Sequence, residues 1–302
     1  MYLEHFNLQE YPFTITPNTQ FYCELPGHKN ALNTLLYSLR AGEGLIKITG
    51  EVGTGKTLLC RMLLNALDAE DIITAYIPNP SLEPLELYKA IASELALEIL
   101  PDVDQSALLS ALYQRLLEYH QQGKRVVVLI DEAQALPTES LEAIRLLTNL
   151  ETETTKLLQV ALFGQPELDS RLRDNQLRQV KQRISFSYKL PVLNQTELST
   201  YLHHRLAVAG YTYGSLFTSQ ARRLLYRSSQ GLPRLINILC HKALLAAYGR
   251  GEKQVDKKAV KAAIADTEGV NSITSDWVYN VLMFGAGVAL VIIVLTVIGF
   301  LR

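Results

Sequence analysis

Residues 50–57 carry the pattern best suited to chemistry, because Gly-Glu-Val-Gly-Thr-Gly-Lys-Thr matches the phosphate-binding sequence G-x-x-x-x-G-K-T in full. Its three glycines let backbone N–H groups converge on phosphate oxygens without a Cβ in the way. Lys56 is expected to reach the β- and γ-phosphates, and the Thr57 hydroxyl to ligate Mg²⁺. The residues expected to contact the nucleotide are Gly50, Glu51, Val52, Gly53, Thr54, Gly55, Lys56, Thr57 and Leu58. The pattern therefore predicts binding of ATP with Mg²⁺.

The segments on either side of this loop have the composition that a phosphate site requires. Residues 45–49 form a short apolar run typical of a buried strand, and residues 58–67 have leucines at helical spacing. The N-terminus of such a helix directs partial positive charge at the phosphates. Strand, glycine loop and helix in this order favour a phosphate site over a chance match.

A second apolar run ends in two carboxylates. Residues 126–132 read Val-Val-Val-Leu-Ile-Asp-Glu, and five apolar residues between polar ones suit a parallel strand buried on both faces. Ligands bind at the carboxyl ends of such strands. Asp131 is therefore expected to hold Mg²⁺ through its water shell, and Glu132 to act as the general base on the attacking water. The alternative is an ordinary strand followed by a helix cap.

Two further polar residues follow expected strands. The strand 157–163 leads to Gln165, which would stand beside the strand of Asp131 and within reach of the γ-phosphate, unless it is a polar turn residue. The strand 72–77 leads to Asn79, which could restrain Glu132 until a partner binds, although a turn-forming asparagine fits equally well. Both positions remain hypotheses at this stage.

Composition excludes several classes of protein. The 302 residues are 48% hydrophobic and 20% charged, which suits a chain with a buried core rather than a disordered one. The formal net charge of −1 provides no global basic field, so no nucleic-acid partner is expected. The three cysteines show no C-x-x-C spacing, and neither a disulfide framework nor a zinc site is indicated.

The C-terminal residues 281–301 are apolar throughout and carry no charge. About 20 apolar residues at 1.5 Å rise span a bilayer core of about 30 Å. Trp277 and Tyr279 precede the run, where aromatic rings favour the membrane interface. The alternative, a buried core helix, would show a polar face. We therefore expect one transmembrane helix, with the ATP-binding body in the cytoplasm, where ATP is found.

The rest of the chain divides into a sheet-forming part and a helical part. Alternating strand and helix patterns predict an α/β fold with a parallel sheet covered on both faces. Beyond residue 195 the strands stop, and helices are expected over 196–209, 219–228, 233–248 and 255–267. The expected domains are a lead-in at 1–44, an α/β core at 45–190, a helical lid at 191–268, a linker at 269–280 and the transmembrane helix at 281–301. Phe13, Tyr22 and His28 could contact the nucleotide base, although simple packing fits them as well.

These motifs, taken together, resemble those of one family. The resemblance covers roughly residues 1–268 and depends on Ile130-Asp-Glu-Ala-Gln134, Leu162-Phe-Gly-Gln-Pro-Glu-Leu168, Gln182-Arg183-Ile184 and Gly231-Leu-Pro-Arg234, besides the phosphate loop. The chain resembles the AAA+ ATPases of the ExeA or general secretion pathway protein A type. Within that type it is most similar to members that serve biogenesis of the mannose-sensitive haemagglutinin (MSHA) pilus.

The resemblance implies roles for three further residues. Gln165 corresponds to the family's sensor 1, and Arg234 to sensor 2 on the helical lid. Arg183 corresponds to an arginine finger that acts on a neighbouring subunit, with Arg178 as the alternative. Each arginine could instead be a solvated helix charge. The implied catalytic set is Glu132, Lys56, Gln165, Arg183 and Arg234.

The family also implies a function. The resemblance implies a P-loop NTPase (AAA+) with a helical lid that forms a homo-oligomer and hydrolyses ATP on the cytoplasmic face of a bacterial inner membrane. It would support assembly of a type IV (MSHA-like) pilus or secretion apparatus through partner proteins of that apparatus. No peptidoglycan-binding segment is recognisable, so direct peptidoglycan binding is not expected. A nucleotide-gated membrane scaffold with little hydrolysis and a DNA-dependent AAA+ ATPase remain the alternatives.

Overall fold

The chain folds into two compact units. The computed structural model describes residues 2–68, 72–99, 103–268 and 270. Thr16–Val192 form one unit, and the described parts of Met1–Ile15 and Leu193–Arg302 form the other. This division differs from the expected lead-in at 1–44, because the first fifteen residues belong to the helical unit. The phosphate loop and the carboxylate pair both lie in the unit Thr16–Val192.

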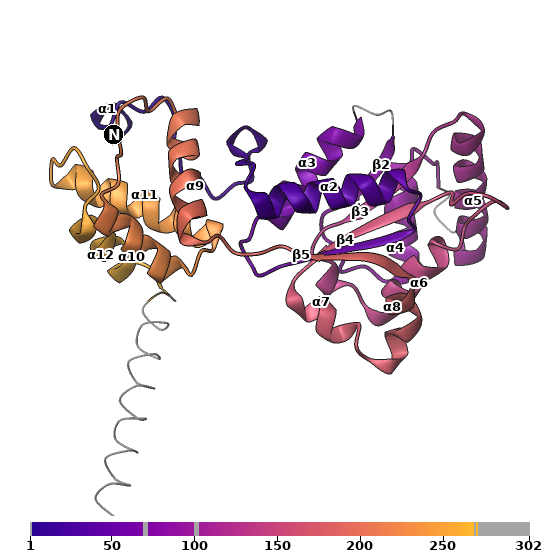
Figure 1. The fold of residues 1–302 in the computed structure, drawn as a ribbon. Helices are drawn as coiled ribbons and strands as arrows, with labels where there is room; N and C mark the ends of the chain where they lie inside the picture. The colour runs from indigo at the N-terminus through magenta and orange to yellow at the C-terminus, as the bar shows by residue number, and fades with distance from the viewer. Residues whose placement is uncertain (1, 69–71, 100–102, 269, 271–302) are drawn as a thin grey trace, which may run out of the picture. The chain divides into compact units, whose positions relative to one another are not determined.

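A five-stranded parallel sheet forms the centre of that unit (Figure 1). The strands, in spatial order, are β2 (Ile73–Ile77), β3 (Val126–Ile130), β4 (Gln159–Gly164), β1 (Leu45–Thr49) and β5 (Ile184–Lys189). The three central strands β3, β4 and β1 are buried along their whole length, as suits their predominantly apolar sequences. The predicted α/β fold with a parallel sheet is confirmed.

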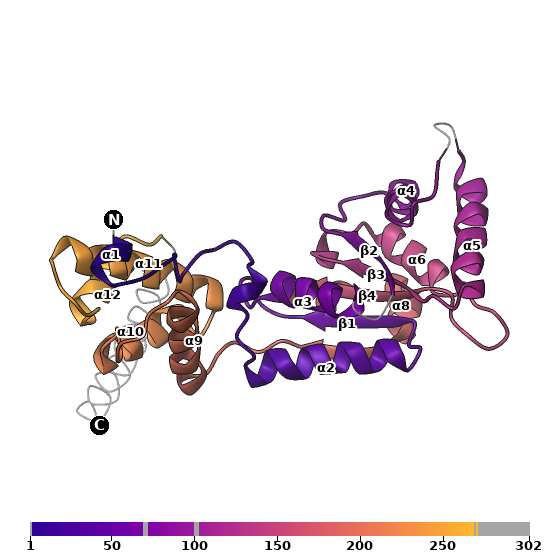
Figure 2. The same ribbon diagram turned by 90° about the horizontal axis from the view of Figure 1, so that it is seen from above.

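Alternate residues of the central strands pack on opposite faces of the sheet. Val127 and Leu129 of β3 face the core beneath α2 (Pro26–Arg40) and α3 (Lys56–Asp68), whereas Val126 and Val128 face the opposite core. The helices that line this opposite core are α4 (Pro84–Glu94), α5 (Gln105–Gln121), α6 (Thr138–Leu147) and α8 (Arg178–Arg183). Figure 1 shows α2 and α3 above the strands and α8 below them, and Figure 2 shows the same sheet from above. Both faces are thus covered.

The edge strand β5 was not anticipated. Its sequence Ile-Ser-Phe-Ser-Tyr-Lys alternates half-buried and exposed residues, and in the sheet it pairs only with β1. Phe186 and Tyr188 pack beside the α2–α3 core, and the intervening residues face solvent. Such alternation is the pattern of a strand with one buried face, which continuous apolar runs do not reveal.

The helical unit contains α1 (Tyr2–His5), α9 (Gln195–Val208), α10 (Ser219–Ser229), α11 (Pro233–Gly249) and α12 (Lys257–Ala265). The N-terminal residues are bound to these helices: the Tyr2 hydroxyl contacts His241 Nδ1 at 2.9 Å. The Asn237 side-chain amide donates to the Thr14 carbonyl at 3.0 Å. Phe13 packs edge-on against Phe217, with ring centroids 5.9 Å apart. Phe13 therefore has a packing partner in this unit.

The predicted membrane location requires correction. Among residues 2–68, 72–99, 103–268 and 270, no helix is both long and apolar enough to cross a bilayer. The longest helices there, α5 and α11, have 17 residues each. At 1.5 Å per residue they measure about 26 Å, shorter than a hydrocarbon core of about 30 Å. The predicted span 281–301 lies outside the described residues. The assignment to a bacterial inner membrane is contradicted and is not retained.

Gly231 occupies a position that only glycine fits. Its φ is +74°, and a Cβ there would lie 2.0 Å from the backbone oxygen of Leu193. The Leu193 N–H in turn donates to the Gly231 carbonyl at 2.9 Å. This close approach holds the start of the helical unit, at Leu193, against the turn that precedes α11.

Gly231→Ala should therefore destabilise the helical unit strongly. Left-handed backbone costs a side-chain-bearing residue about 1–2 kcal/mol, and the clash with backbone atoms adds to this cost. We expect a loss of about 2 kcal/mol or more in the free energy of unfolding, measured by denaturant titration. Gly249→Ala is the matched control, because nothing lies within 4 Å of a Cβ at that position. Equal midpoints for the two variants would contradict the prediction.

Candidate nucleotide site

The loop Gly50–Lys56 connects β1 to α3 and has the backbone that phosphate binding requires. Gly53 and Gly55 have φ values of +83° and +99°, which favour glycine. A Cβ at Gly50 would lie 2.9 Å from Thr54 Oγ1 and 3.2 Å from the Leu190 carbonyl oxygen. Each of the three glycines is thus required by the loop's own geometry. Except at Gly50 and Thr54, whose N–H groups donate to the Gly164 and Glu51 carbonyls, the open backbone leaves N–H groups of the turn to bind phosphate oxygens.

His28, from α2, supports this loop. Its Nε2 contacts the Thr54 carbonyl oxygen at 2.9 Å, and a Cβ at Gly55 would lie 3.1 Å from the same nitrogen. The Tyr22 ring packs edge-on against the His28 ring at 6.4 Å. Of the three residues considered for base contacts, His28 therefore touches the backbone of the phosphate loop itself. Its place in the structure is that of a support for the loop.

Lys56 is buried beneath the loop at the first position of α3. Its ammonium donates to the Gly50 carbonyl at 2.8 Å and to the Glu51 carbonyl at 3.0 Å. Burial lowers the pKa of Lys56, while the carboxylates of Glu132 and Asp131 oppose that shift. A buried ammonium whose hydrogen bonds, within the described residues, go to backbone carbonyls is suited to receiving an anion, so this observation fits a bound nucleotide phosphate.

Asp131 and Thr57, the two expected metal ligands, meet at the end of β3. Asp131 is 2% exposed, and its carboxylate accepts hydrogen bonds from the Thr57 side chain and, at 2.9 Å, from the Glu132 N–H. Burial raises the pKa of Asp131, although both hydrogen bonds oppose the shift. A carboxylate and a hydroxyl are hard oxygen donors of the kind that Mg²⁺ takes beside nucleotide phosphates. The donor set therefore fits Mg²⁺.

Glu132 is held by two glutamines. Its φ is +51°, an uncommon conformation for a residue with a side chain. Its Oε2 accepts a hydrogen bond from Gln134 Nε2 at 2.5 Å and another from Gln165 Nε2 at 2.9 Å. Gln165 follows β4, which pairs with β3 along the chain from Gln159 to Leu162. The structure thus brings the expected base and the expected sensor into direct contact.

The structure shows other partners for Glu132 than Asn79. Asn79 is exposed, and the side-chain hydrogen bonds found for Glu132 within the described residues come from Gln134 and Gln165. Sequence analysis missed Gln134 as a site residue. The only signal was its place two residues after Glu132 in the Asp-Glu-Ala-Gln motif.

Sequence analysis also missed a polar cluster next to the site, formed by Lys47, Thr49 and Asp169. Lys47 of β1 forms an ion pair with Asp169, and the Thr49 hydroxyl donates to the other carboxylate oxygen of Asp169 at 2.9 Å. Asp169 belongs to α7 (Pro166–Arg171), which begins directly after Gln165. This contact ties the helix behind Gln165 to the strand that leads into the phosphate loop. The signal in the sequence was a lysine within a buried strand.

The candidate arginines lie apart from these residues. Arg178 and Arg183 are exposed at the two ends of α8. Ile184, next to Arg183, pairs with Leu45 at the amino end of β1, whereas the phosphate loop follows its carboxyl end. Five residues at about 3.3 Å each separate those ends by roughly 13–16 Å. Arg183 is therefore remote from the phosphate loop of its own chain. Arg234 is exposed in the first turn of α11, in the other unit.

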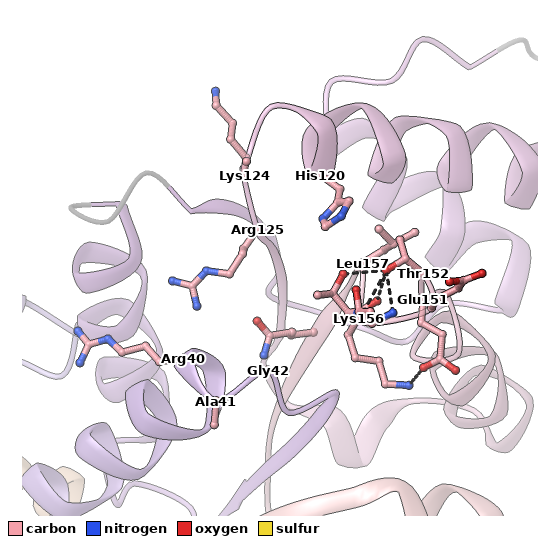
Figure 3. A pocket seen from close by; sticks show the side chains of 15 residues that line it. Arg40, Ala41, Gly42, His120, Lys124, Arg125, Glu151, Thr152, Lys156 and Leu157 are labelled. Atoms are coloured by element: carbon pink, nitrogen blue, oxygen red, sulfur yellow. Dashed lines mark hydrogen bonds and ion pairs between the residues drawn. The ribbon is translucent and has the colours of Figure 1, made fainter.

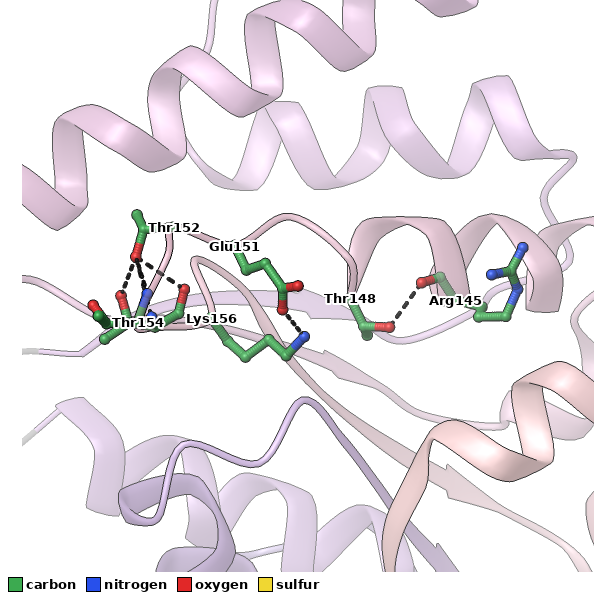
Figure 4. A network of polar contacts seen from close by, with 7 residues as sticks. Arg145, Thr148, Glu151, Thr152, Thr154 and Lys156 are labelled. Atoms are coloured by element: carbon green, nitrogen blue, oxygen red, sulfur yellow. Dashed lines mark hydrogen bonds and ion pairs between the residues drawn. The ribbon is translucent and has the colours of Figure 1, made fainter.

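A separate cavity of about 640 Å³ opens at the amino ends of the strands (Figure 3). It is lined by the end of α2, the turn before β3 and the segment 151–157. In that segment the Thr152 hydroxyl bonds the Thr155 hydroxyl at 2.9 Å, and Glu151 pairs with Lys156 (Figure 4). Lys156 lowers the pKa of the Glu151 carboxyl, and Arg183 adds to that shift. The segment thus lies close to Arg183 and away from the phosphate loop.

Comparison with known proteins agrees with this geometry. Residues 39–172 match the family described as an AAA domain. Over 291 residues the chain is 43% identical to General secretion pathway protein A of Aeromonas hydrophila, an alignment that covers 96% of this chain and 53% of that protein. The chain therefore spans about half the length of this relative. The predicted resemblance to ATPases of the general secretion pathway protein A type is confirmed.

Solved structures share the fold at low sequence identity. The Aeropyrum pernix ORC2 protein, in its ADPNP–ADP complexes, has a TM-score of 0.59 at 19% identity and covers 82% of this chain and 68% of its own. Cdc6p from Pyrobaculum aerophilum has a TM-score of 0.64 at 15% identity, with coverages of 83% and 71%. These similarities support the P-loop NTPase fold and carry no information on this chain's substrates or partners.

Proposed function

We propose that this chain, an AAA-domain protein of the general secretion pathway protein A type, hydrolyses ATP to drive assembly of a type IV (MSHA-like) pilus or a secretion apparatus. One observation carries the enzymatic part of the proposal. Lys56, the Thr57–Asp131 pair and the Glu132–Gln165 pair lie where three neighbouring parallel strands end, the place where such sheets bind ligands. The apparatus is inferred from the relative's name and from the motifs.

We assign each side chain of the site a separate role in phosphoryl transfer. Backbone N–H groups of the phosphate loop and the Lys56 ammonium bind the phosphates, and Thr57 and Asp131 would hold Mg²⁺. When bound there, Mg²⁺ would supply positive charge that offsets negative charge on the nucleotide phosphates. Glu132 takes the proton of the attacking water, and Gln165, beside it, contacts the γ-phosphate. These are the groups that phosphoryl transfer needs for positioning and charge stabilisation.

The arginines complete the site between subunits. Because Arg183 is remote from its own phosphate loop, it can reach only the nucleotide of a neighbouring subunit. For Arg234, near the start of α11, we carry over the sensor 2 role that the resemblance implies. An arginine supplied by a second subunit makes hydrolysis depend on assembly. We therefore propose a homo-oligomer with shared active sites, whose working partners are proteins of the pilus or secretion apparatus.

Mixing two inactive variants tests the shared site. Arg183→Ala removes the donated arginine and Glu132→Gln removes the base, so each variant alone should lose most of its turnover. A mixture should regain part of it, because an intact Glu132 can then face an intact Arg183 across an interface. Steady-state phosphate release at several protein concentrations measures the effect, with Arg178→Ala as the alternative finger. A mixture as inactive as its components, with turnover independent of concentration, would rule out the shared site.

A further inference from the structure

We propose that Gln134 is the residue that positions the catalytic base, holding the Glu132 carboxylate and the Gln165 backbone as one unit throughout the ATP cycle. The inference rests on the proposed ATPase function and extends it to a residue with no assigned role. Gln134 lies in the short 3₁₀ helix η2 (Ala133–Ala135), directly after the base. It touches neither the phosphate loop nor the metal ligands through any hydrogen bond found in the described residues.

The side-chain amide of Gln134 bridges two elements. Its Nε2 donates to Glu132 Oε2 at 2.5 Å, and its Oε1 accepts the Gln165 backbone N–H at 2.9 Å. A backbone N–H can only donate and an ionised carboxylate can only accept. The partners therefore dictate which end of the amide faces which neighbour. Glutamate or a hydrocarbon at this position cannot make both bonds.

The backbone around Gln134 is fixed from the other side. Arg171, at the end of α7, donates from one guanidinium nitrogen to the Gln134 carbonyl at 2.7 Å and to the Leu136 carbonyl at 2.5 Å. Gly164, the last residue of β4, lies beside the amide, and a Cβ there would lie 2.7 Å from Leu168 Cδ2 of α7 but only in ordinary contact with Gln134 Oε1, at 3.4 Å. The Asp-Glu-Ala-Gln and Gly-Gln-Pro-Glu-Leu motifs thus form one hydrogen-bonded unit.

This arrangement has a consequence during the ATP cycle. Glu132 has two amide donors, and one of them, Gln165, must turn toward the γ-phosphate to contact it. The carboxylate then keeps only the bond from Gln134. Gln134 also keeps its hydrogen bond to the backbone N–H of Gln165. The Glu132 carboxylate and the Gln165 backbone therefore keep their relative positions while the Gln165 side chain moves. Without Gln134, the Glu132 carboxylate loses its remaining positioning partner at the moment when water must be activated.

Gln134→Met tests the proposal, because methionine keeps the length of the side chain and removes both hydrogen bonds. We expect kcat to fall about 10- to 100-fold, the scale of a misplaced catalytic group. The Kd for ATP should stay close to the wild-type value, since no phosphate ligand is changed. In a Glu132→Gln background the same substitution should cause no further loss of kcat. Gln121→Met, on an exposed residue at the end of α5, is the matched control.

Hydrogen exchange of the Gln165 backbone N–H provides a measurement that does not depend on ATP hydrolysis. This N–H donates to Gln134 Oε1, so Gln134→Met should speed its hydrogen exchange, while exchange in the central strands should stay unchanged. If wild-type turnover equals that of Lys56→Ala, the proposed ATPase function fails, and the exchange result alone decides the role of Gln134. Unchanged kcat in Gln134→Met, or unchanged exchange at Gln165, would overturn the inference.

Discussion

Glu132→Gln is expected to lower kcat for ATP hydrolysis by about 10²–10⁴-fold, the range that a general base contributes. Glutamine has nearly the same shape, and its carbonyl oxygen can still accept from the Gln134 and Gln165 amides that hold the carboxylate. The residue can no longer take a proton from water. Neither Lys56 nor the Thr57–Asp131 pair is disturbed, so ATP should bind with nearly unchanged affinity and remain unhydrolysed.

Two measurements on the Glu132→Gln variant separate chemistry from binding. Phosphate release under saturating ATP gives kcat, and equilibrium titration with ATP gives Kd. Glu139→Gln, an exposed carboxylate near the start of α6, controls for the loss of one negative charge. If Glu132→Gln hydrolyses ATP as fast as Glu139→Gln does, Glu132 is not the base.

Lys56→Ala is expected to abolish useful ATP binding. Hydrogen bonds to charged groups contribute about 1.5–3 kcal/mol each, so losing the phosphate contacts of one ammonium weakens affinity by about 10- to 100-fold or more. The substitution should lower the free energy of unfolding less in the protein without ATP than in the protein with ATP bound. Burial of the ammonium disfavours its charged form, as the lowered pKa of Lys56 indicates, so removing it also removes a desolvation cost.

The thermal midpoint of unfolding reports this difference directly. A ligand that binds only the folded state raises the midpoint in proportion to its occupancy. MgATP should therefore raise the midpoint of the wild type and leave that of Lys56→Ala unchanged. Lys124→Ala is the matched control, since Lys124 is exposed and lines the cavity at the opposite end of the strands. An ATP-dependent shift as large in Lys56→Ala as in Lys124→Ala would contradict the role of Lys56.

The central strands and the helices α9 to α12 were predictable because each carries its own local signal. The strand β3 is a continuous apolar run, β1 is an apolar run interrupted by Lys47, and both begin at the predicted residues, Val126 and Leu45. The helices α9 to α12 lie within two residues of most predicted boundaries, with Gly210 and Gly231 as local stops. The phosphate loop is specified by a contiguous motif, so no tertiary information was needed to find it.

The features that escaped prediction depend on contacts between distant residues. Residues 2–15 join the helical unit through bonds such as Arg205 to the Pro12 carbonyl, a separation of 193 positions that no local pattern reveals. The Lys47–Asp169 pair and the Gln134–Gln165 contact likewise join separate segments of the chain. Lysine in a buried strand, or glutamine after a carboxylate, indicates an unpaired polar group without saying which residue satisfies it.

Steady-state ATP turnover of the 302-residue chain, compared with Lys56→Ala over a range of protein concentrations, tests the central claim most directly. The account predicts turnover that Lys56→Ala lacks and specific activity that rises with concentration as subunits supply Arg183 to one another. A wild type that binds ATP but hydrolyses it no faster than Lys56→Ala at every concentration would contradict the claim. The chain would then be a nucleotide-gated scaffold rather than an ATPase.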